Sequence, residues 1–441
     1  MTSSLAARAL LVLLASSPCL PGLALAASPE RPVLVIGASD FRPLPIAVPA
    51  FAGAGDAQGA AAEVTGVVRS DLTLSGLFDV LDPRGYLADP SEGLASIQIA
   101  FRRWADVGAD GLVKAAVRLE GGELTGELHL YEVQSAREVL VTTLRVPPSA
   151  VRLLGHRMSD EIFRYYTHEP GVFSTRIAAI RKLNDLYELI TFDPDGQNLQ
   201  VLLHEKDILL LPAWRPDGAE ILLTSYRTGR PELWAYRLAD QSFRSLAHRG
   251  NSMGGVYSPD GKRIAFCLTE GGNTDLWVMN VDGSGARRLT RDPAIDVSPF
   301  WSPDGKQIAF ASDRAGTPQL YVMNADGTQV RRLTFQGNYN QTPCWSPRGD
   351  AIAFTARDER KVFDLFQVTP DNGVITRITQ DQGRTNEEPS YSPNGRLMVF
   401  RTDRNGAGQL VISDPKGNRQ TVILSAGGGD LVDPAWGPLP R

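Results

Sequence analysis

The chain has 441 residues, of which 42% are hydrophobic and 22% charged, and its formal net charge is −5. This length predicts two or three domains, and the apolar content suffices for a full hydrophobic core. Without a surplus of basic residues, a nucleic-acid-binding function is set aside.

Residues 1–26 have the pattern of a cleavable export signal. Arg8 supplies a positive charge, the apolar run Ala9–Ala15 follows, and Ala24-Leu25-Ala26 fits a small-x-small cleavage site, with the cut after Ala26. A transmembrane anchor is the alternative, but serines and prolines break the apolar run well below the ~18–20 residues that a span needs. The sequence therefore predicts export to the periplasm, and no later segment is predicted to span a membrane.

Residues 27–170 are predicted to form a small α/β domain. The expected strands are Val33–Gly37, Ile46–Ala50, Phe78–Leu81, Leu112–Leu119, Glu127–Val133 and Val139–Val146. The expected helices are Ala57–Ser75, Ile97–Val107 and a third one that Ser149 caps and that ends near Thr167.

A repeated aromatic-x-Pro-x-Gly pattern organises the rest of the chain. The aromatic residues stand 43 to 46 positions apart, at Trp214, Tyr257, Trp301, Trp345, Tyr391 and Trp436. A period of about 40–45 residues built on strands is typical of a β-propeller, with one blade per repeat.

One repeat contains four predicted strands. They are Val297–Trp301, Gln307–Ala311, Gln319–Met323 and the more polar outer strand Gln329–Thr334. The first unit, from Arg176 to His204, lacks an innermost strand, and Leu431–Trp436 at the chain end is such a strand alone. Joining these two fragments closes a ring of six blades and leaves no open edge. The predicted fold is therefore α+β: a small N-terminal α/β domain followed by a six-bladed propeller over residues 171–441.

Two features of the repeats lead to further predictions. Proline stands two residues before the aromatic in five units, which places it at a strand start or where no neighbour pairs, and the innermost strand that lines the channel can accept it. Cys267 and Cys344 are the cysteines that remain after residue 26. Cysteines of an exported protein can pair, but these two fall in blades that are not adjacent, so we expect two free, buried thiols.

A search for catalytic and metal-binding patterns predicts no catalytic residue, no cofactor and no metal site. Gly250-x-Ser252-x-Gly254 matches a hydrolase motif but lies between blades, where a glycine-rich loop is expected. The five histidines have no metal-ligand spacing, and the Asp residues of the Pro-Asp-Gly turns are expected to bond their own backbone. The residues leave two alternatives open: a hydrolase or lyase with its chemistry in the channel, and a propeller that binds a small molecule or a glycan.

Several segments resemble the TolB family of the Tol–Pal system. The similarity is carried by Pro32–Ile36, Arg42–Phe51, Leu74–Phe78, Ser159–Phe163 and Thr175–Ile177. The resemblance implies a non-catalytic, monomeric periplasmic adaptor. Its propeller mouth binds Pal, a peptidoglycan-associated outer-membrane lipoprotein, and its N-terminal segment binds the C-terminal domain of the inner-membrane protein TolA. Pal binding sequesters that segment, and other outer-membrane lipoproteins are further possible partners. The implied role is in outer-membrane integrity and constriction during cell division.

The resemblance also assigns residues to the two binding regions. The Pal surface is implied at the inter-blade loops before the innermost strands, which carry Asn251, Gly254, Asp296, Val297, Ser298, Asn340, Gln341 and Glu387. The TolA-binding tail is implied at Ala27–Asp40, with Ser28, Glu30, Arg31, Val33 and Val35. The family carries His, Ala and Thr where this chain has Asn251, Gly254 and Val297. Turn formation is the alternative role for each loop residue.

Overall fold

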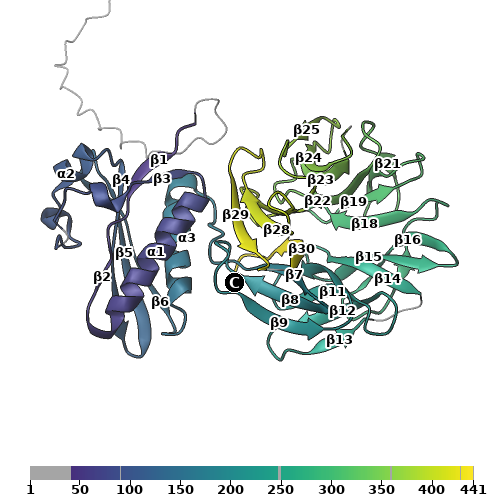
Figure 1. Ribbon diagram of the computed structural model, residues 1–441, viewed down its shortest axis with the longest axis horizontal. Coiled ribbons are helices and arrows are strands. Elements are labelled where there is room, and N and C mark those ends of the chain that lie inside the picture. The colour runs from purple at the N-terminus through teal and green to yellow at the C-terminus, as the bar shows by residue number, and fades with distance from the viewer. Residues whose placement is uncertain (1–40, 90, 247–249, 358–359, 428, 441) are drawn as a thin grey trace, which may run out of the picture.

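The computed structural model describes residues 41–89, 91–246, 250–357, 360–427 and 429–440. Figure 1 shows a small domain of helices and strands beside a large ring of strands. The predicted signal peptide, the predicted strand Val33–Gly37 and the predicted TolA-binding tail lie outside the described residues.

The N-terminal domain is built on one mixed sheet with strand order β3-β1-β4-β5-β6, to which β2 adds beside β4. Strand β1 runs parallel to β3 and β4, and the other pairs on the main path are antiparallel. The strands are β1 (Leu44–Ala47), β2 (Ala52–Gly53), β3 (Phe78–Val80), β4 (Gly111–Glu120), β5 (Glu123–Glu132) and β6 (Arg137–Val146).

Helices α1 (Gln58–Leu74) and α3 (Val151–Thr167) pack together over one face of this sheet. A Cβ at Gly155 of α3 would lie 2.7 Å from Val67 of α1, so glycine is needed for this close approach. The other face is covered near helix α2 (Phe101–Asp106) by Trp104, which packs with Leu112 and Tyr131. The sheet is therefore buried on both faces along much of β4.

The structure corrects three details of the predicted domain. The predicted helix Ile97–Val107 is two pieces, a 3₁₀ turn at Ser96–Gln98 and helix α2. Ser149 does not cap α3, because Ala150 is the N-cap residue and no side chain bonds to the first turn. Strand β1 begins two residues earlier than predicted and ends at Ala47, where Val48 turns to bond the hydroxyl of Tyr86.

Residues 177–436 form six four-stranded antiparallel sheets, as predicted for six blades. Blade one consists of β30 (Asp430–Trp436), β7 (Ile177–Leu183), β8 (Leu186–Phe192) and β9 (Gln200–Glu205). Blade two consists of β10 (Leu209–Trp214), β11 (Glu220–Ser225), β12 (Glu232–Arg237) and β13 (Phe243–Ser245). Blade three consists of β14 (Asn251–Tyr257), β15 (Arg263–Glu270), β16 (Asn273–Asn280) and β17 (Arg287–Arg288). Blade four consists of β18 (Asp296–Trp301), β19 (Gln307–Ser312), β20 (Gln319–Asn324) and β21 (Arg331–Arg332). Blade five consists of β22 (Asn340–Trp345), β23 (Ile352–Arg357), β24 (Phe363–Val368) and β25 (Ile375–Arg377). Blade six consists of β26 (Asn386–Tyr391), β27 (Met398–Thr402), β28 (Gln409–Ser413) and β29 (Gln420–Ser425). The outer strand predicted at Gln329–Thr334 is only the two residues of β21.

The ring closes as the sequence predicts, because the last strand completes the first blade. Strand β30 pairs antiparallel with β7, so that Trp436 lies opposite Ile177. The indole N–H of Trp436 donates to Thr175 (2.8 Å) and its backbone N–H donates to Ser390 of blade six (2.9 Å). The two ends of the propeller are thus joined in one sheet and tied to the neighbouring blade.

Each innermost strand contains one residue in the left-handed region, and this feature was not predicted. The residue stands three positions before the aromatic, with φ between 49° and 61° at Leu211, Gly254, Ser298, Thr342, Glu388 and Asp433. The strand register shifts at the same place in all six blades. The repeated proline therefore follows a bulge inside the innermost strand, at one of the two predicted kinds of position, where no ladder N–H is needed.

The bulge also explains why the predicted loop residues are in fact strand residues. Asn251, Asp296, Asn340 and Asn386 are the first residues of innermost strands, which pair above the bulge as well as below it. We call the channel end where these strands begin the mouth, and the end where their aromatic residues lie the base.

The N-terminal domain is fixed to the base of the propeller. Glu169, just after α3, forms ion pairs with Arg348 (2.6 Å) and Arg396 (2.7 Å), which lie in the base turns of blades five and six. Asn394 of the same region donates to the carbonyl of Pro170 (2.9 Å). The mouth is therefore at the far end of the channel from the small domain.

Other sequence predictions for the propeller are confirmed. Cys267 and Cys344 are free and buried in blades three and five. Asp217, Asp260 and Asp304 each accept the backbone N–H two residues further along their turns, at 3.0–3.1 Å.

Candidate functional site

The channel has a chamber of about 290 Å³ below the mouth, lined by innermost strands. Its wall contains the five repeat prolines, three of the six repeat aromatics (Trp214, Tyr257 and Trp436), Cys267 and Cys344. Among the lining residues, all within the described part of the chain, Glu388 and Asp433 carry the only carboxyl groups, and no lysine or arginine is present. The chamber is therefore an apolar space with one acidic spot.

Glu388 and Asp433 occupy equivalent bulge positions in neighbouring blades. Each accepts a backbone N–H from the next blade: Asp433 donates to Glu388 at 2.6 Å and Leu211 donates to Asp433 at 2.9 Å. Burial raises the pKa of Glu388 well above its usual range, and the charge of Asp433 raises it further. Burial also raises the pKa of Asp433. The pair therefore tends to hold a proton between its two carboxyl groups.

The mouth itself is a ring of six half-buried side chains. They stand one residue before each bulge, at Leu210, Met253, Val297, Gln341, Glu387 and Val432. Four of them are apolar, and the two polar ones are neighbours in blades five and six. Burial raises the pKa of Glu387, although Arg401 lies 3.5 Å away.

The residues implied for Pal binding divide into two groups in the structure. Val297, Gln341 and Glu387 belong to the mouth ring, Gly254 and Ser298 are at bulges, and Asn251 is exposed at the start of its strand. Asp296 and Asn340 are instead buried inside their blades.

Both buried residues have their hydrogen bonds satisfied within the protein. Asp296 accepts both bonds of an ion pair with Arg314, at 2.8 and 2.9 Å. The amide of Asn340 donates to Gln319 (3.0 Å) and to the carbonyl of Gln336 (2.9 Å). Asp296 thereby anchors the β19–β20 turn of its own blade, and Asn340 anchors the loop between blades four and five.

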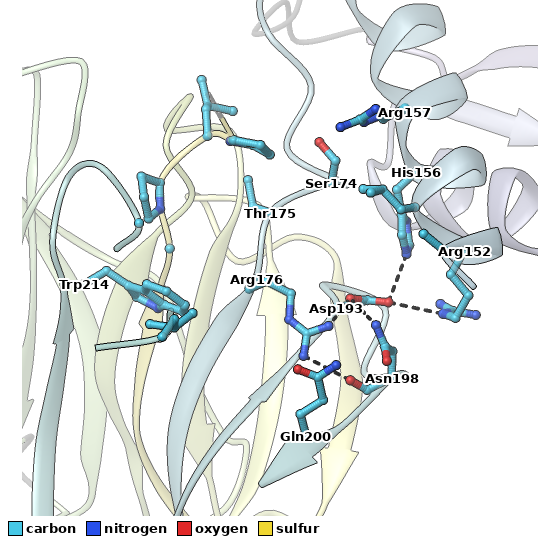
Figure 2. A pocket seen from close by; sticks show the side chains of 18 of the residues that line it. Arg152, His156, Arg157, Ser174, Thr175, Arg176, Asp193, Asn198, Gln200 and Trp214 are labelled. Carbon is cyan, nitrogen blue, oxygen red and sulfur yellow. Dashed lines mark hydrogen bonds and ion pairs between the residues drawn. The ribbon is translucent and has the colours of Figure 1, made fainter. Parts of the chain in front are cut away.

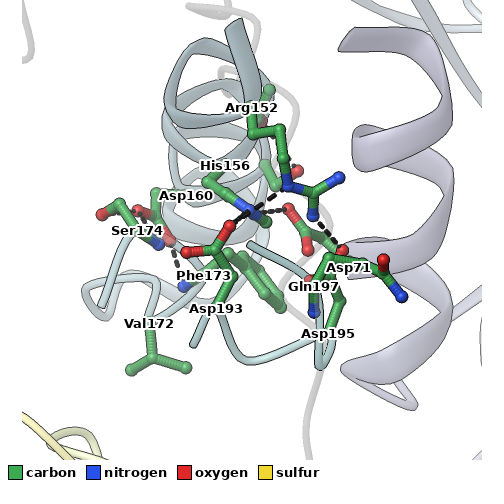
Figure 3. A network of polar contacts seen from close by, with 12 residues as sticks. Asp71, Arg152, His156, Asp160, Val172, Phe173, Ser174, Asp193, Asp195 and Gln197 are labelled. Atoms are coloured by element: carbon green, nitrogen blue, oxygen red, sulfur yellow. Dashed lines mark hydrogen bonds and ion pairs between the residues drawn. The ribbon is translucent and has the colours of Figure 1, made fainter. Parts of the chain in front are cut away.

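A second polar site joins the two domains and was not predicted. His156 of α3 contacts Asp71 of α1 through Nδ1 (2.8 Å) and Asp193 of the β8–β9 turn through Nε2 (3.3 Å). Arg152 binds Asp193 (3.2 Å) and also Asp195. Figure 3 shows these side chains meeting between the two helices and the propeller turn.

Three cations face three carboxylates in this interdomain network, since Arg176 also binds Asp193 at 2.7 Å. Burial by itself opposes protonation of His156, but the charges and hydrogen bonds of Asp71 and Asp193 outweigh it and raise the pKa of His156 to about 10. Burial raises the pKa of Asp71 as well. We place the proton on the imidazole, because only then are the three carboxylates matched in charge.

Ligand atoms of Asp71, His156 and Asp195 lie within 4.8 Å of one another, close enough to share a metal ion. The contacts just described already engage each of these residues: both imidazole nitrogens meet carboxylates, and Asp195 meets Arg152. The donor set as built is therefore that of a salt-bridge network. No sequence signal identified it, because His156 is isolated in the sequence and Asp71 lies 85 residues away.

The linker between the domains is anchored beside this network. Asp160 of α3 accepts the backbone N–H groups of Phe173 (2.8 Å) and Ser174 (3.2 Å). Burial raises the pKa of Asp160 to about 6, against the effect of these hydrogen bonds. Movement of the small domain would therefore have to break both the linker contacts and the charge network.

Ser252 of the hydrolase-like motif has a structural role. It is 1% exposed within β14, and its hydroxyl accepts the backbone N–H of Leu233 at 3.2 Å. A nucleophile elbow requires a sharp strand-to-helix turn with an exposed serine. Here a strand follows, so the geometry of an elbow is not formed.

In the described part of the chain, no helix has the length and apolar character to cross a membrane. Two family profiles match the chain: "TolB amino-terminal domain" at residues 32–139 and "TolB beta propeller domain" at residues 163–440.

Curated relatives and a solved structure match at the full-chain level. The "Tol-Pal system protein TolB" of Anaeromyxobacter dehalogenans strain 2CP-C is 69% identical, over 90% of this chain and 91% of the relative. The protein of the same name from Myxococcus xanthus strain DK1622 is 47% identical, over 90% and 92%. The crystal structure of TolB from Acinetobacter baumannii has a TM-score of 0.80 and 29% identity, over 90% of this chain and 97% of that one.

Proposed function

The chain belongs to the TolB family of Tol–Pal system proteins, and from this membership we propose that it is a non-catalytic periplasmic adaptor. In this proposal the mouth of the propeller binds the lipoprotein Pal, and the N-terminal tail binds the C-terminal domain of TolA. The adaptor would thereby support outer-membrane integrity and constriction during cell division. The observation that carries the proposal is the full-length family match, combined with a mouth that the small domain leaves free.

The chemistry of the mouth suits a protein partner. The half-buried ring offers an apolar arc of Leu210, Met253, Val297 and Val432 next to the polar pair Gln341 and Glu387. An apolar centre with a polar edge is the usual anatomy of a docking surface.

Two inter-blade loops carry exposed apolar side chains. Ile295 is 50% exposed just before β18, and Phe335 is 72% exposed in the loop before β22. We propose that these two side chains add to the contact with the partner. We therefore assign partner contact to the ring and these loop residues, and a supporting role to the buried Asp296 and Asn340.

The tail Ala27–Asp40 precedes the small domain in the sequence, and the described contacts between this domain and the propeller lie at the base. The described contacts at this junction are the ion pairs of the linker residue Glu169, the hydrogen bonds of Asp160 of α3 to the linker, and the interdomain network around His156. We propose that these contacts transmit Pal binding to the tail Ala27–Asp40, so that the tail is sequestered when Pal is bound.

The test is calorimetric titration with the soluble domain of Pal from the same organism. Residues 27–441 and residues 41–441 are both expected to bind Pal with micromolar or tighter affinity, and only the longer chain is expected to bind the TolA domain. No Pal binding by either chain would refute the proposal.

A pair of charge changes locates the binding face. Glu387→Lys at the mouth is expected to weaken Pal binding about tenfold or more. Lys306→Glu, in the exposed base turn between β18 and β19, is the matched control and should leave Pal binding unchanged. Equal loss in both variants would contradict docking at the mouth.

A further inference from the structure

A cleft of about 680 Å³ lies between the two domains, separate from the channel chamber. Its walls come from the start of α3, the linker, the propeller base and the C-terminal residues 437–440. Figure 2 shows Arg152, Arg157 and Arg176 with Ser174 and Asn198 around this space, and Trp214 across from them. Both domains thus contribute polar side chains to one concave site.

The cleft presents cations and hides their partners. The side chains of Arg152 and Arg176 are 23% and 24% exposed, whereas their partners Asp193 and Asp195 are 7% and 5% exposed. At these ion pairs a ligand meets the guanidinium groups before their buried partners, whereas elsewhere in the lining Glu63 is exposed and Asp217 is partly exposed.

Arg157 adds a cation whose charge is uncompensated. Its side chain is exposed, and its one recorded hydrogen bond, 3.4 Å long, goes to the carbonyl of Arg145. The carboxylates that also line the cleft are Glu63, Asp193 and Asp217, and Asp217 is paired with Arg215 at 3.3 Å. Within the interdomain network, His156, Arg152 and Arg176 are balanced by Asp71, Asp193 and Asp195. Among the described residues of the lining, Arg157 is therefore the guanidinium that is left to pair with an incoming anion.

The first turn of α3 strengthens the attraction for anions. Ala150 provides no side-chain cap, and the hydrogen bonds recorded among the described residues use none of the N–H groups of Val151, Arg152 and Leu153. These residues line the cleft, and the helix runs for 17 residues behind them. Free N–H groups at a helix start attract negative charge.

We propose that this interdomain cleft is a binding site for a small oxyanion, a carboxylate or a phosphate, held by Arg157, the exposed edges of Arg152 and Arg176, and the first turn of α3. Trp214, Pro438 and Leu439 form an apolar wall in the same cleft, against which the body of an organic anion would lie. Because guanidinium groups and helix N–H groups recognise the oxyanion itself, the free ion and its organic esters share this chemistry.

The experiment is calorimetric titration of residues 27–441 with inorganic phosphate, glycerol 3-phosphate and glucuronate, with glucose as the neutral control. Saturable binding of at least one anion, and none of glucose, is expected. An ester or sugar acid that binds tenfold more tightly than phosphate identifies an organic ligand that uses the apolar wall. Equal affinities identify free phosphate. Absence of saturation by all three anions at 10 mM would overturn the proposal.

Two variants separate binding from folding. Arg157→Gln is expected to weaken anion binding about tenfold, because it removes one charge-assisted hydrogen bond. Arg102→Gln, on the exposed surface of α2, is the matched control and should leave anion binding unchanged. Ala150→Asp supplies the missing cap and occupies the helix N–H groups, so the melting temperature should rise or stay unchanged while anion binding is lost. Unchanged anion affinity in both Arg157→Gln and Ala150→Asp would refute the site. Neither result depends on Pal or TolA, so the adaptor proposal is tested independently.

Discussion

Replacing His156 by glutamine tests the charge assignment in the interdomain network. The imidazole is 2% exposed and lies between the carboxylates of Asp71 and Asp193. Its pKa of about 10 in the folded protein compares with an ordinary value of 6.5. At about 1.4 kcal/mol for each pH unit, this interval corresponds to about 5 kcal/mol of folding free energy.

The sign of the pH dependence follows from proton binding. Between pH 6.5 and about 10 the folded protein keeps a proton that the unfolded chain releases. The stability from this proton is therefore complete below pH 6.5 and is lost as the pH rises through 10. Glutamine carries no such proton, so the destabilisation by His156→Gln should be about 3 kcal/mol smaller at pH 9.0 than at pH 6.5.

Urea unfolding at both pH values, followed by tryptophan fluorescence, measures this difference directly. His204→Gln is the control, because His204 contacts Glu188 but is 63% exposed and should show a small effect at either pH. An equal free-energy loss for His156→Gln at pH 6.5 and pH 9.0 would show that the folded protein does not hold the proton.

Three further predictions concern the propeller. Trp436→Ala removes the indole that joins the last strand to Thr175. Urea unfolding should therefore show that the free energy of unfolding falls by about 3–5 kcal/mol. A fall below about 1 kcal/mol would argue against closure of the ring by this strand. Burial raises the pKa of Glu388. Above the ordinary pKa of a glutamate, the folded protein therefore keeps a proton that the unfolded chain has released. The free energy of unfolding falls as the pH rises through this range. Glu388→Gln should therefore match the parent protein near pH 4.5 and be about 1–3 kcal/mol more stable at pH 8 by urea unfolding, whereas equal stability at pH 8 would contradict the shared proton. Burial raises the pKa of both Cys267 and Cys344 to about 12. A thiol reagent should therefore modify neither cysteine in the folded protein and both in urea. Fast labelling of the folded protein would show that the two thiols are accessible and reactive.

The propeller could be predicted because its signals are local and repeated. Each Pro-Asp-Gly turn and each aromatic residue reports on a few neighbouring residues, and the repetition of the pattern from Trp214 to Trp436 sets the number of blades. The complementary fragments at the two ends of the repeat region then predict closure. The helices at 58–74 and 151–167 were likewise visible from the spacing of apolar residues.

The individual site residues could not be predicted in the same way. Asp296 and Asn340 were assigned to a binding surface, but both side chains are buried: Arg314 reaches Asp296 from a turn of the same blade, and Gln319 reaches Asn340 from a strand of the preceding blade. The bulge at Glu388 depends on neighbouring blades, which offer acceptors for its backbone N–H. Such contacts leave no pattern within a short window of sequence.

By itself the sequence determined the two-part organisation, the six blades, the closing strand and the free cysteines, since these follow from short-range periodicity and chain connectivity. Only the tertiary structure decided which charged groups meet. Asp71, His156 and Asp193 are far apart in the chain, and they meet because α1, α3 and the first blade pack at one interface. There, burial by itself opposes a charge on His156, but the carboxylates of Asp71 and Asp193 outweigh it and make this histidine a cation that joins the two domains.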